Sequence, residues 1–310
     1  MNKLEKNILL TLIFFGILQK SLTEREFYEL LWQKETNFNE FKKALQKLVK
    51  AGKIEKSDKY YYLPGNKNII TKIVKKEALS KKYWREAKKV IKLLARAPFV
   101  KMIAVSGSLA LENVNKNSDI DLVILSDKKH LRLTRDITIV MLAMLKRLVR
   151  QCSSKIKFGP DIFMDFRNSS LESVAEGFLG FRRMYSVYLT ALAKPVYIKK
   201  NAHLSYQKNN NWLKHYLPNF QYRDWRKYEI KKRNITQQTF ESFFKTGFGR
   251  KIKKRINEKQ YVRLEKVKKM LGEKNIINED DRIIQLPAAG KKWLDFEKKF
   301  HELLTRYKLI

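Results

Sequence analysis

The stretch of residues 103–125, IAVSGSLALENVNKNSDIDLVIL, constrains the fold more than any other part of the chain. Residues 102–105 are apolar and few enough for a buried strand, and Gly107 and Ser108 follow them directly. Residues 109–111 can open a helix, and the free N–H groups at the start of a helix attract anions. The pattern predicts a strand, a phosphate-binding turn and a helix in succession.

Two acidic residues begin the second apolar run of this stretch, which reads Asp119-Ile120-Asp121-Leu122. Because side chains alternate along a strand, both aspartates point to one face while Ile120 and Leu122 point into the core. Two neighbouring carboxylates are unfavourable unless a cation neutralises them, and oxygen ligands favour Mg²⁺ or Mn²⁺. An isolated pair of alternating acids is also typical of a solvated strand face, so the nearby Gly-Ser turn makes the prediction specific. The pattern predicts a site for a nucleoside triphosphate.

The order of these features resembles the signature of the DNA polymerase β-like nucleotidyltransferase superfamily: an apolar residue, Gly107-Ser108, a spacer of roughly ten residues, then Asp119 and Asp121. The resemblance covers residues 83–198. It implies an α/β (α+β) nucleotidyltransferase core with a small mixed sheet, which moves a nucleoside monophosphate from an NTP to an acceptor. It also implies that the two aspartates hold Mg²⁺ or Mn²⁺, while the Gly-Ser turn holds the β- and γ-phosphates.

The family uses a third carboxylate from a later strand. After a helix expected over 130–151, residues 157–166 form the strand-like candidate, and they contain Asp161 and Asp165. We favour Asp161 as a catalytic residue and metal ligand because it begins the apolar run. Pro160 weakens this choice because it removes a backbone donor from the strand ladder. Asp165, or a surface position for both acids, stays open as an alternative.

Residues 1–65 are similar in pattern to winged-helix domains. Thr23 and Asn37 are suited to cap two helices, and residues 54–63 read as a small hairpin. The third helix of such domains often enters a DNA major groove, although many winged helices bind proteins instead. Here that helix carries four lysines: Lys42, Lys43, Lys47 and Lys50.

The rest of the chain divides into a helical linker at 66–98, the nucleotidyltransferase core at 99–198 and a basic helical domain at 199–310. Helices are expected over 204–216, 225–246, 250–271 and 291–307. The third of these carries the densest basic run of the chain, and Tyr261 within it could stack on a base. A solvated helix face explains the same basic residues.

Charge points to a polyanionic partner. The chain has 67 Lys and Arg against 31 Asp and Glu, which gives a net charge of +36 and a pI near 10.1. Such an excess predicts strong attraction to nucleic acid and a marked dependence on salt. A generally lysine-rich source proteome would give the same composition. We take nucleic acid, and RNA in particular, as the leading partner.

Several classes of protein are disfavoured. No apolar run reaches the roughly 20 residues that span a bilayer, and residues 2–18 resemble a signal peptide but lack a small-residue cleavage site. The single cysteine, Cys152, excludes an intramolecular disulfide. We therefore expect a cytoplasmic protein without a membrane partner. We also expect no structural zinc, because the histidines are scattered: His130, His203, His215 and His301.

The preferred function is Mg²⁺-dependent transfer of a nucleoside monophosphate from an NTP to a hydroxyl acceptor, with an RNA end favoured. One alternative is a non-enzymatic winged-helix nucleic-acid-binding regulator that retains a degenerate nucleotidyltransferase fold. Another is an enzyme of the toxin-antitoxin type that nucleotidylates proteins. Asp161 discriminates between enzyme and regulator, because the regulator hypothesis gains if this carboxylate does not approach Asp119 and Asp121.

Overall fold

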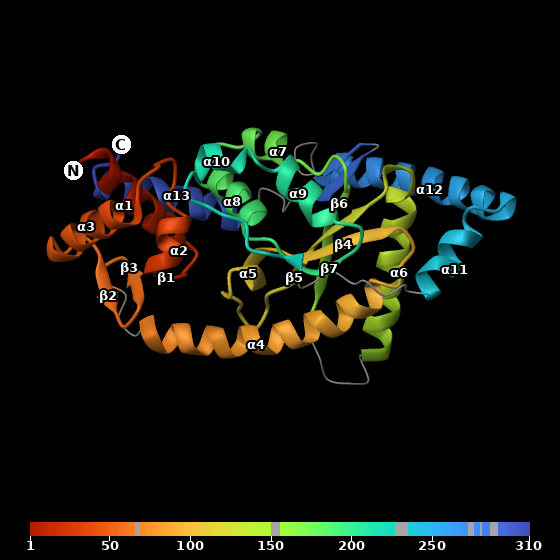
Figure 1. Ribbon diagram of the computed structural model, residues 1–310, viewed down its shortest axis with the longest axis horizontal. Helices are drawn as coiled ribbons and strands as arrows, with labels where there is room; N and C mark the ends of the chain where they lie inside the picture. The colour runs from red at the N-terminus through yellow and green to blue at the C-terminus, as the bar shows by residue number, and fades with distance from the viewer. Residues whose placement is uncertain (66–68, 150–155, 227–234, 272–275, 280, 286–290) are drawn as a thin grey trace.

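The molecule is elongated, with its two ends of chain at the same extremity (Figure 1). The structure is a computed structural model that describes residues 1–65, 69–149, 156–226, 235–271, 276–279, 281–285 and 291–310. Cys152 lies outside these residues. Among the described helices, none is both long and apolar enough to cross a membrane.

The N-terminal segment contains three helices and a three-stranded antiparallel sheet of order β1-β3-β2. Its elements are α1 (Lys3–Ile17), β1 (Leu22–Thr23), α2 (Glu24–Glu29), α3 (Phe38–Lys50), β2 (Glu55–Ser57) and β3 (Tyr60–Tyr62). Both expected caps are present: the side chain of Thr23 accepts from the Glu26 N–H, and that of Asn37 accepts from the Glu40 N–H. The assignment of this segment as a winged helix stays a prediction.

A six-stranded mixed sheet forms the centre of the molecule, in the order β7-β4-β5-β6-β9-β8. Strands β5 and β6 are parallel, and the other neighbours are antiparallel. The elements from this part of the chain are α4 (Ile69–Leu94), β4 (Val100–Val105), α5 (Gly107–Ala110), β5 (Ile120–Ser126), α6 (Leu131–Val149), β6 (Phe158–Asp165), α7 (Glu172–Glu176), α8 (Gly180–Ala191) and β7 (Lys194–Ile198).

The C-terminal region is not wholly helical, and this corrects the sequence-based expectation. It contains α9 (Ala202–Asn209), α10 (Leu213–Tyr216), α11 (Ile235–Phe243), α12 (Gly247–Leu271), β8 (Ile276–Asn278), β9 (Arg282–Gln285) and α13 (Lys291–Arg306). The hairpin β8–β9 extends the central sheet, because β9 pairs with β6. Its strands are three and four residues long, too short to show a period in the sequence.

Two of the expected C-terminal helices also differ from the structure. The helix expected over 204–216 is divided between α9 and α10 because Asn210 turns its buried side chain to backbone groups: it donates to the oxygens of Ser169 and Tyr206. Of the helix expected over 225–246, only α11 is described, and 227–234 lie outside the described residues.

Helices cover both faces of the central sheet. On one face, apolar residues of α4 and α6, with Leu264 of α12, pack against the sheet. On the other face, α7 and α9 pack against it. A separate core joins α1, α8 and α13, where the ring of Phe181 lies 4.7 Å from that of Phe14 and 5.7 Å from that of Phe300. The first and last helices therefore share one core, although the sequence analysis places them in different domains. The division of the chain into four domains stays a prediction.

Candidate active site

A cavity of about 790 Å³ lies between one end of the central sheet and the helices α8 and α13. The side chains of Asp119, Asp121 and Asp161 all line it, together with Ser108. Three acids that span more than forty residues of the chain thus border one space. Asp119 precedes β5, Asp121 lies on it, and Asp161 lies on the neighbouring strand β6.

The turn at Gly107 packs directly against the carboxylate of Asp121. Gly107 has φ +61°, and a Cβ at this position would overlap Oδ2 of Asp121 and lie 2.9 Å from its Cγ. The N–H of Ser106 also donates to the backbone oxygen of Asp121 at 2.9 Å. Glycine is required here both by the backbone conformation and by the lack of space. The helix α5 begins at Gly107 itself and is a single turn of four residues.

A bulge between β5 and β6 places Asp161. Asp121 pairs with Gly159 and Val123 pairs with Ile162, so two residues of β6, Pro160 and Asp161, face a single residue of β5. Bulges redirect side chains and interrupt the ladder of backbone hydrogen bonds. An interrupted ladder also accommodates a proline in this interior strand, where β6 is flanked by β5 and β9.

The alternative third carboxylate, Asp165, lies at the other end of β6. It pairs with Ser126 in the sheet, is buried, and has an oxygen 3.5 Å from Nε of Arg167. It is not among the residues that line the cavity. Of the two acids considered in the sequence, Asp161 is the one that the structure brings to the cavity.

Electrostatics link Asp161 to the aspartate pair. Burial raises the pKa of Asp161, the negative charge of Asp119 raises it further, and Arg135 of α6 opposes both. Burial in turn lowers the pKa of the Arg135 guanidinium. The two neighbouring charges thus act on Asp161 in opposite directions: Asp119 disfavours its ionisation and Arg135 favours it.

The loop before Asp119 is held from two sides. The hydroxyl of Tyr83, on α4, donates to the backbone oxygen of Asn115 at 3.1 Å. The side chain of Asn113 donates to the backbone oxygen of Leu18 at 2.7 Å and accepts from Nζ of Lys76, also at 2.7 Å. These bonds fix the loop to α4 and to the end of α1, so the N-terminal helix forms part of the cavity wall.

The donor set fits a cation that is shared with a substrate. Among the described residues, no group of three or more His, Cys, Asp and Glu side chains is close enough to hold a metal ion. Asp119 and Asp121 form a two-carboxylate set on one face. Mg²⁺ is commonly bound by one or two carboxylates together with substrate phosphates, whereas cages made wholly of protein ligands are unusual for it. The pair suits that arrangement.

Several residues of the cavity were not anticipated from the sequence. They are Arg182 and Tyr185 of α8, and Trp293, Phe296 and Lys299 of α13. The spacing of the aromatic residues in α13 indicates an amphipathic helix. The spacing does not indicate that the apolar face of α13 borders a cavity. Most of the other residues that line this cavity lie more than a hundred positions earlier in the chain.

Residues 88–159 match the family model described as "Polymerase beta, Nucleotidyltransferase". The matched segment includes Gly107, Ser108, Asp119 and Asp121, and it ends two residues before Asp161. No curated protein and no solved structure matches the chain. The matched segment contains the sheet strands β4 and β5 and the helix α5 between them, and an α+β core is consistent with the family. The family match supports a nucleotidyltransferase domain of the DNA polymerase β-like superfamily at residues 88–159.

Proposed function

We propose that the protein is a metal-dependent nucleotidyltransferase that moves a nucleoside monophosphate from an NTP to a hydroxyl acceptor, with an RNA end as the acceptor. The observation that carries this proposal is the convergence of Asp119, Asp121 and Asp161 on one cavity, beside the turn at Gly107 and Ser108. The family match over 88–159 supports the same class of reaction.

The proposed step is an in-line displacement at the α-phosphorus. The acceptor hydroxyl oxygen forms a new bond to this phosphorus, and the bond to the bridging oxygen breaks, so pyrophosphate leaves with the electron pair. Asp161 accepts the hydroxyl proton, and the raised pKa of its carboxylate supports this role. Asp119 and Asp121 would hold Mg²⁺ or Mn²⁺, whose chemistry is stabilisation of the charge that develops on the phosphate oxygens. Backbone N–H groups of the turn and the Ser108 hydroxyl donate to the β- and γ-phosphates.

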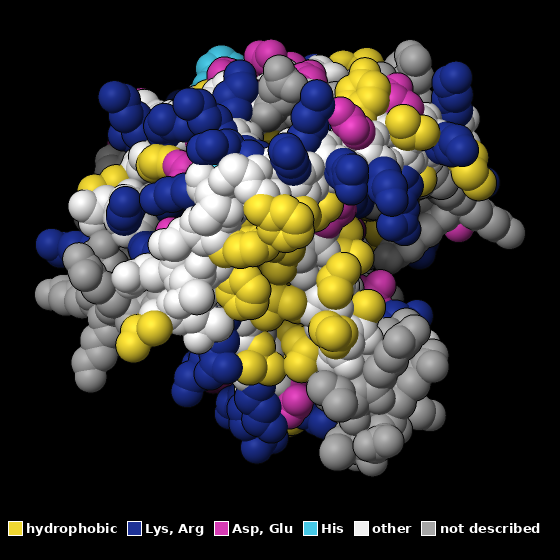
Figure 2. Space-filling view, turned by 90° about the vertical axis from the view of Figure 1, so that its right-hand side faces the viewer, with side chains coloured by type: hydrophobic (Ala, Val, Ile, Leu, Met, Phe, Trp, Pro, Cys, Tyr) yellow, Lys and Arg dark blue, Asp and Glu magenta, His cyan; other side chains and the backbone are white. Residues whose placement is uncertain are grey.

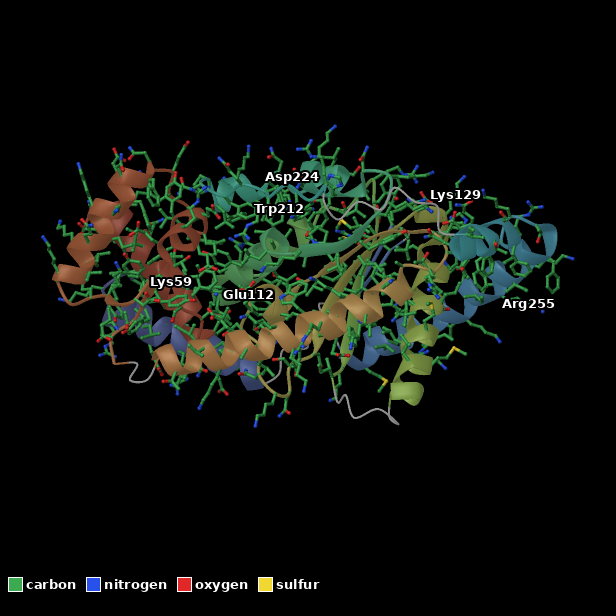
Figure 3. The ribbon with its side chains drawn as sticks, turned by 60° about the horizontal axis from the view of Figure 1, so that its bottom comes forward. Lys59, Glu112, Lys129, Trp212, Asp224 and Arg255 are labelled. Carbon is green, nitrogen blue, oxygen red and sulfur yellow. The ribbon has the colours of Figure 1, made fainter. Side chains whose placement is uncertain are left out.

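A basic surface supports RNA as the acceptor. At the end of the molecule formed by α11 and α12, lysines and arginines border a strip of apolar side chains (Figure 2). Lys129 and Arg255 lie at this end, opposite Lys59 (Figure 3). Exposed aromatic side chains accompany the charge: Phe248 is 67% exposed and Tyr261 is 50% exposed. Single-stranded nucleic acids bind to such surfaces by phosphate contacts and base stacking.

The test is incubation of the protein with each α-labelled NTP, Mg²⁺ or Mn²⁺ and a pool of small RNAs. We expect label on RNA with the wild type and none with an Asp119→Asn, Asp121→Asn double variant. Asp161→Asn should also abolish transfer, whereas Asp165→Asn, which changes an acid of the same strand outside the cavity, should retain it. Transfer that survives in the double variant would show that these carboxylates are not the reaction centre.

A nucleic-acid-binding regulator is the second candidate. It is favoured by the exposed lysines Lys42, Lys43 and Lys50 of α3. Binding of RNA or DNA without label transfer from any NTP would support it. Label that appears on a protein, with RNA left unlabelled, would instead support protein nucleotidylation.

A further inference from the structure

The cavity has a second wall, opposite in chemistry to the acidic one. It is built by α8 and α13, both outside the segment that matches the family model. We propose that this wall binds the incoming NTP, with Trp293 stacking on the base, Tyr185 contacting the edge of the base, and Arg182 and Lys299 pairing with the phosphates. The proposal rests on the proposed function, because it assigns the nucleotide subsite of the same reaction.

The aromatic part of the wall is a cluster of rings that meet edge to face. The ring centroid of Trp293 lies 4.8 Å from that of Tyr185 and 6.0 Å from that of Phe296. All three side chains are half-buried and line the cavity. Neutral aromatic surface in a cavity is suited to a planar base.

Arg182, one of the two cations of the wall, lies near two aromatic rings. The guanidinium of Arg182 lies 4.2 Å from the ring centroid of Phe178 and 5.9 Å from that of Trp293. Burial lowers the pKa of Arg182, and the nearby Glu297 carboxylate opposes this effect. Arginine remains charged even so. A partly desolvated cation interacts more strongly with phosphate oxygens than one in water.

Hydrogen bonds from the start of α8 to a glutamate side chain of α13 hold the two helices of the wall together. The carboxylate of Glu297, on α13, accepts from the backbone N–H groups of Phe181 and Arg182 at 3.3 and 3.1 Å. These groups belong to the first turn of α8, where a negative charge is favourable. Gly180 has φ +52°, and a Cβ there would lie 2.9 Å from Oε2 of Glu297. The wall is thus fixed before any ligand binds, and a fixed site loses less entropy on binding.

Charge complementarity identifies the ligand as a nucleoside triphosphate. One side of the cavity carries three carboxylates, and the other carries two cations and a group of aromatic rings. A cationic ligand would match the acids alone, and a purely apolar ligand would match the rings alone. An NTP with its divalent cation matches both walls. A volume of about 790 Å³ is also within the usual range of roughly 300–1,000 Å³ for ligand pockets.

Binding of each labelled NTP in Mg²⁺, without acceptor, tests the wall by equilibrium dialysis. We expect Trp293→Leu to weaken binding roughly tenfold or more, which corresponds to the removal of one stacking interaction. Trp293→Phe keeps a ring and should retain most of the affinity. Arg182→Gln should weaken binding as well. The control is Leu204→Ala, which removes an exposed apolar side chain on α9, outside the cavity, and should leave binding unchanged.

Unchanged NTP binding by both Trp293→Leu and Arg182→Gln would overturn the proposal, as would an equal loss in Leu204→Ala. Denaturant unfolding of each variant separates weakened stacking from a damaged fold, and Trp293→Phe provides a folded reference. Label transfer distinguishes this proposal from the proposed function. If the wild type transfers label and Trp293→Leu binds NTP normally, the assignment of this wall as the NTP subsite is wrong and the proposed function stands. If no acceptor is labelled but NTP binding depends on Trp293, the assignment of the NTP subsite stands and the proposed function is wrong.

Discussion

Replacement of Gly107 by alanine should damage the proposed reaction centre through the carboxylate of Asp121. The backbone at Gly107 has φ +61°, and a side chain in this left-handed region costs roughly 1–2 kcal/mol. The new Cβ would overlap Oδ2 of Asp121 and lie 2.9 Å from its Cγ. Moving that side chain off its rotamer costs a further 0.5–1.5 kcal/mol or so. The free energy of unfolding should therefore fall by roughly 1.5–3.5 kcal/mol.

The effect on activity should be larger than the effect on stability. A displacement of about 1 Å at a reacting group can lower the rate about 100-fold, and Asp121 must move by a distance of this order. We expect nucleotide transfer by Gly107→Ala to fall at least about 100-fold. The assay is label transfer from an α-labelled NTP at saturating substrate, alongside denaturant unfolding.

Gly52 provides the matched control. Its φ is +65°, close to that of Gly107, but a Cβ there would have nothing within 4 Å. Gly52→Ala should therefore show the backbone cost of roughly 1–2 kcal/mol and keep full activity. Near-normal transfer by Gly107→Ala would refute the reasoning, and so would an equal loss of activity in Gly52→Ala.

Three further predictions concern other parts of the molecule. The pKa of Asp161 is raised above its ordinary 3.8, so the contribution of this residue to stability is fully present below that value and is lost as pH rises through the folded-state pKa. Asp161→Asn should therefore be more stable than the wild type at pH 7, and the difference measured by denaturant unfolding should shrink toward pH 4. An equal difference at all pH values would contradict this. Phe181→Ala, in the core of α1, α8 and α13, should lower the free energy of unfolding by about 3–5 kcal/mol, and a loss below about 1 kcal/mol would show that these helices do not share a core. Replacement of Lys251, Lys254 and Arg255 of α12 by glutamine should reduce the salt dependence of RNA binding, by roughly one unit of log–log slope for each phosphate that the protein no longer neutralises. The control replaces Lys81, Lys82 and Lys88 of α4 by glutamine, which removes the same charge and should have little effect. Equal effects of the two triple variants would indicate that net charge alone attracts the RNA.

Local features were predictable from the sequence. Thr23 and Asn37 act as helix caps within their own segments, and capping depends on neighbouring backbone groups. The Gly107 turn and the strand with Asp121 are likewise adjacent in the chain. The alternation of acidic and apolar residues was enough to place Asp119 and Asp121 on one side of the strand.

Features that depend on distant partners were not predictable in the same way. The position of Asp161 in the cavity depends on a bulge in the pairing of β5 and β6, which a regular alternation does not reveal. The strand β9 exists by pairing with β6, because a run of four residues has little intrinsic preference. The role of α13 in the cavity depends on its packing against α1 and α8, and no local pattern specifies that contact.

Binding of Mn²⁺ together with a nucleotide tests the central claim most directly, through the relaxation of water protons by protein-bound Mn²⁺. The wild type, mixed with Mn²⁺ and a non-hydrolysable NTP analogue, should show enhanced relaxation that is lost in the Asp119→Asn, Asp121→Asn double variant and kept in Asp165→Asn. Equal enhancement in the double variant and the wild type would contradict the assignment of these two carboxylates to a metal–nucleotide site.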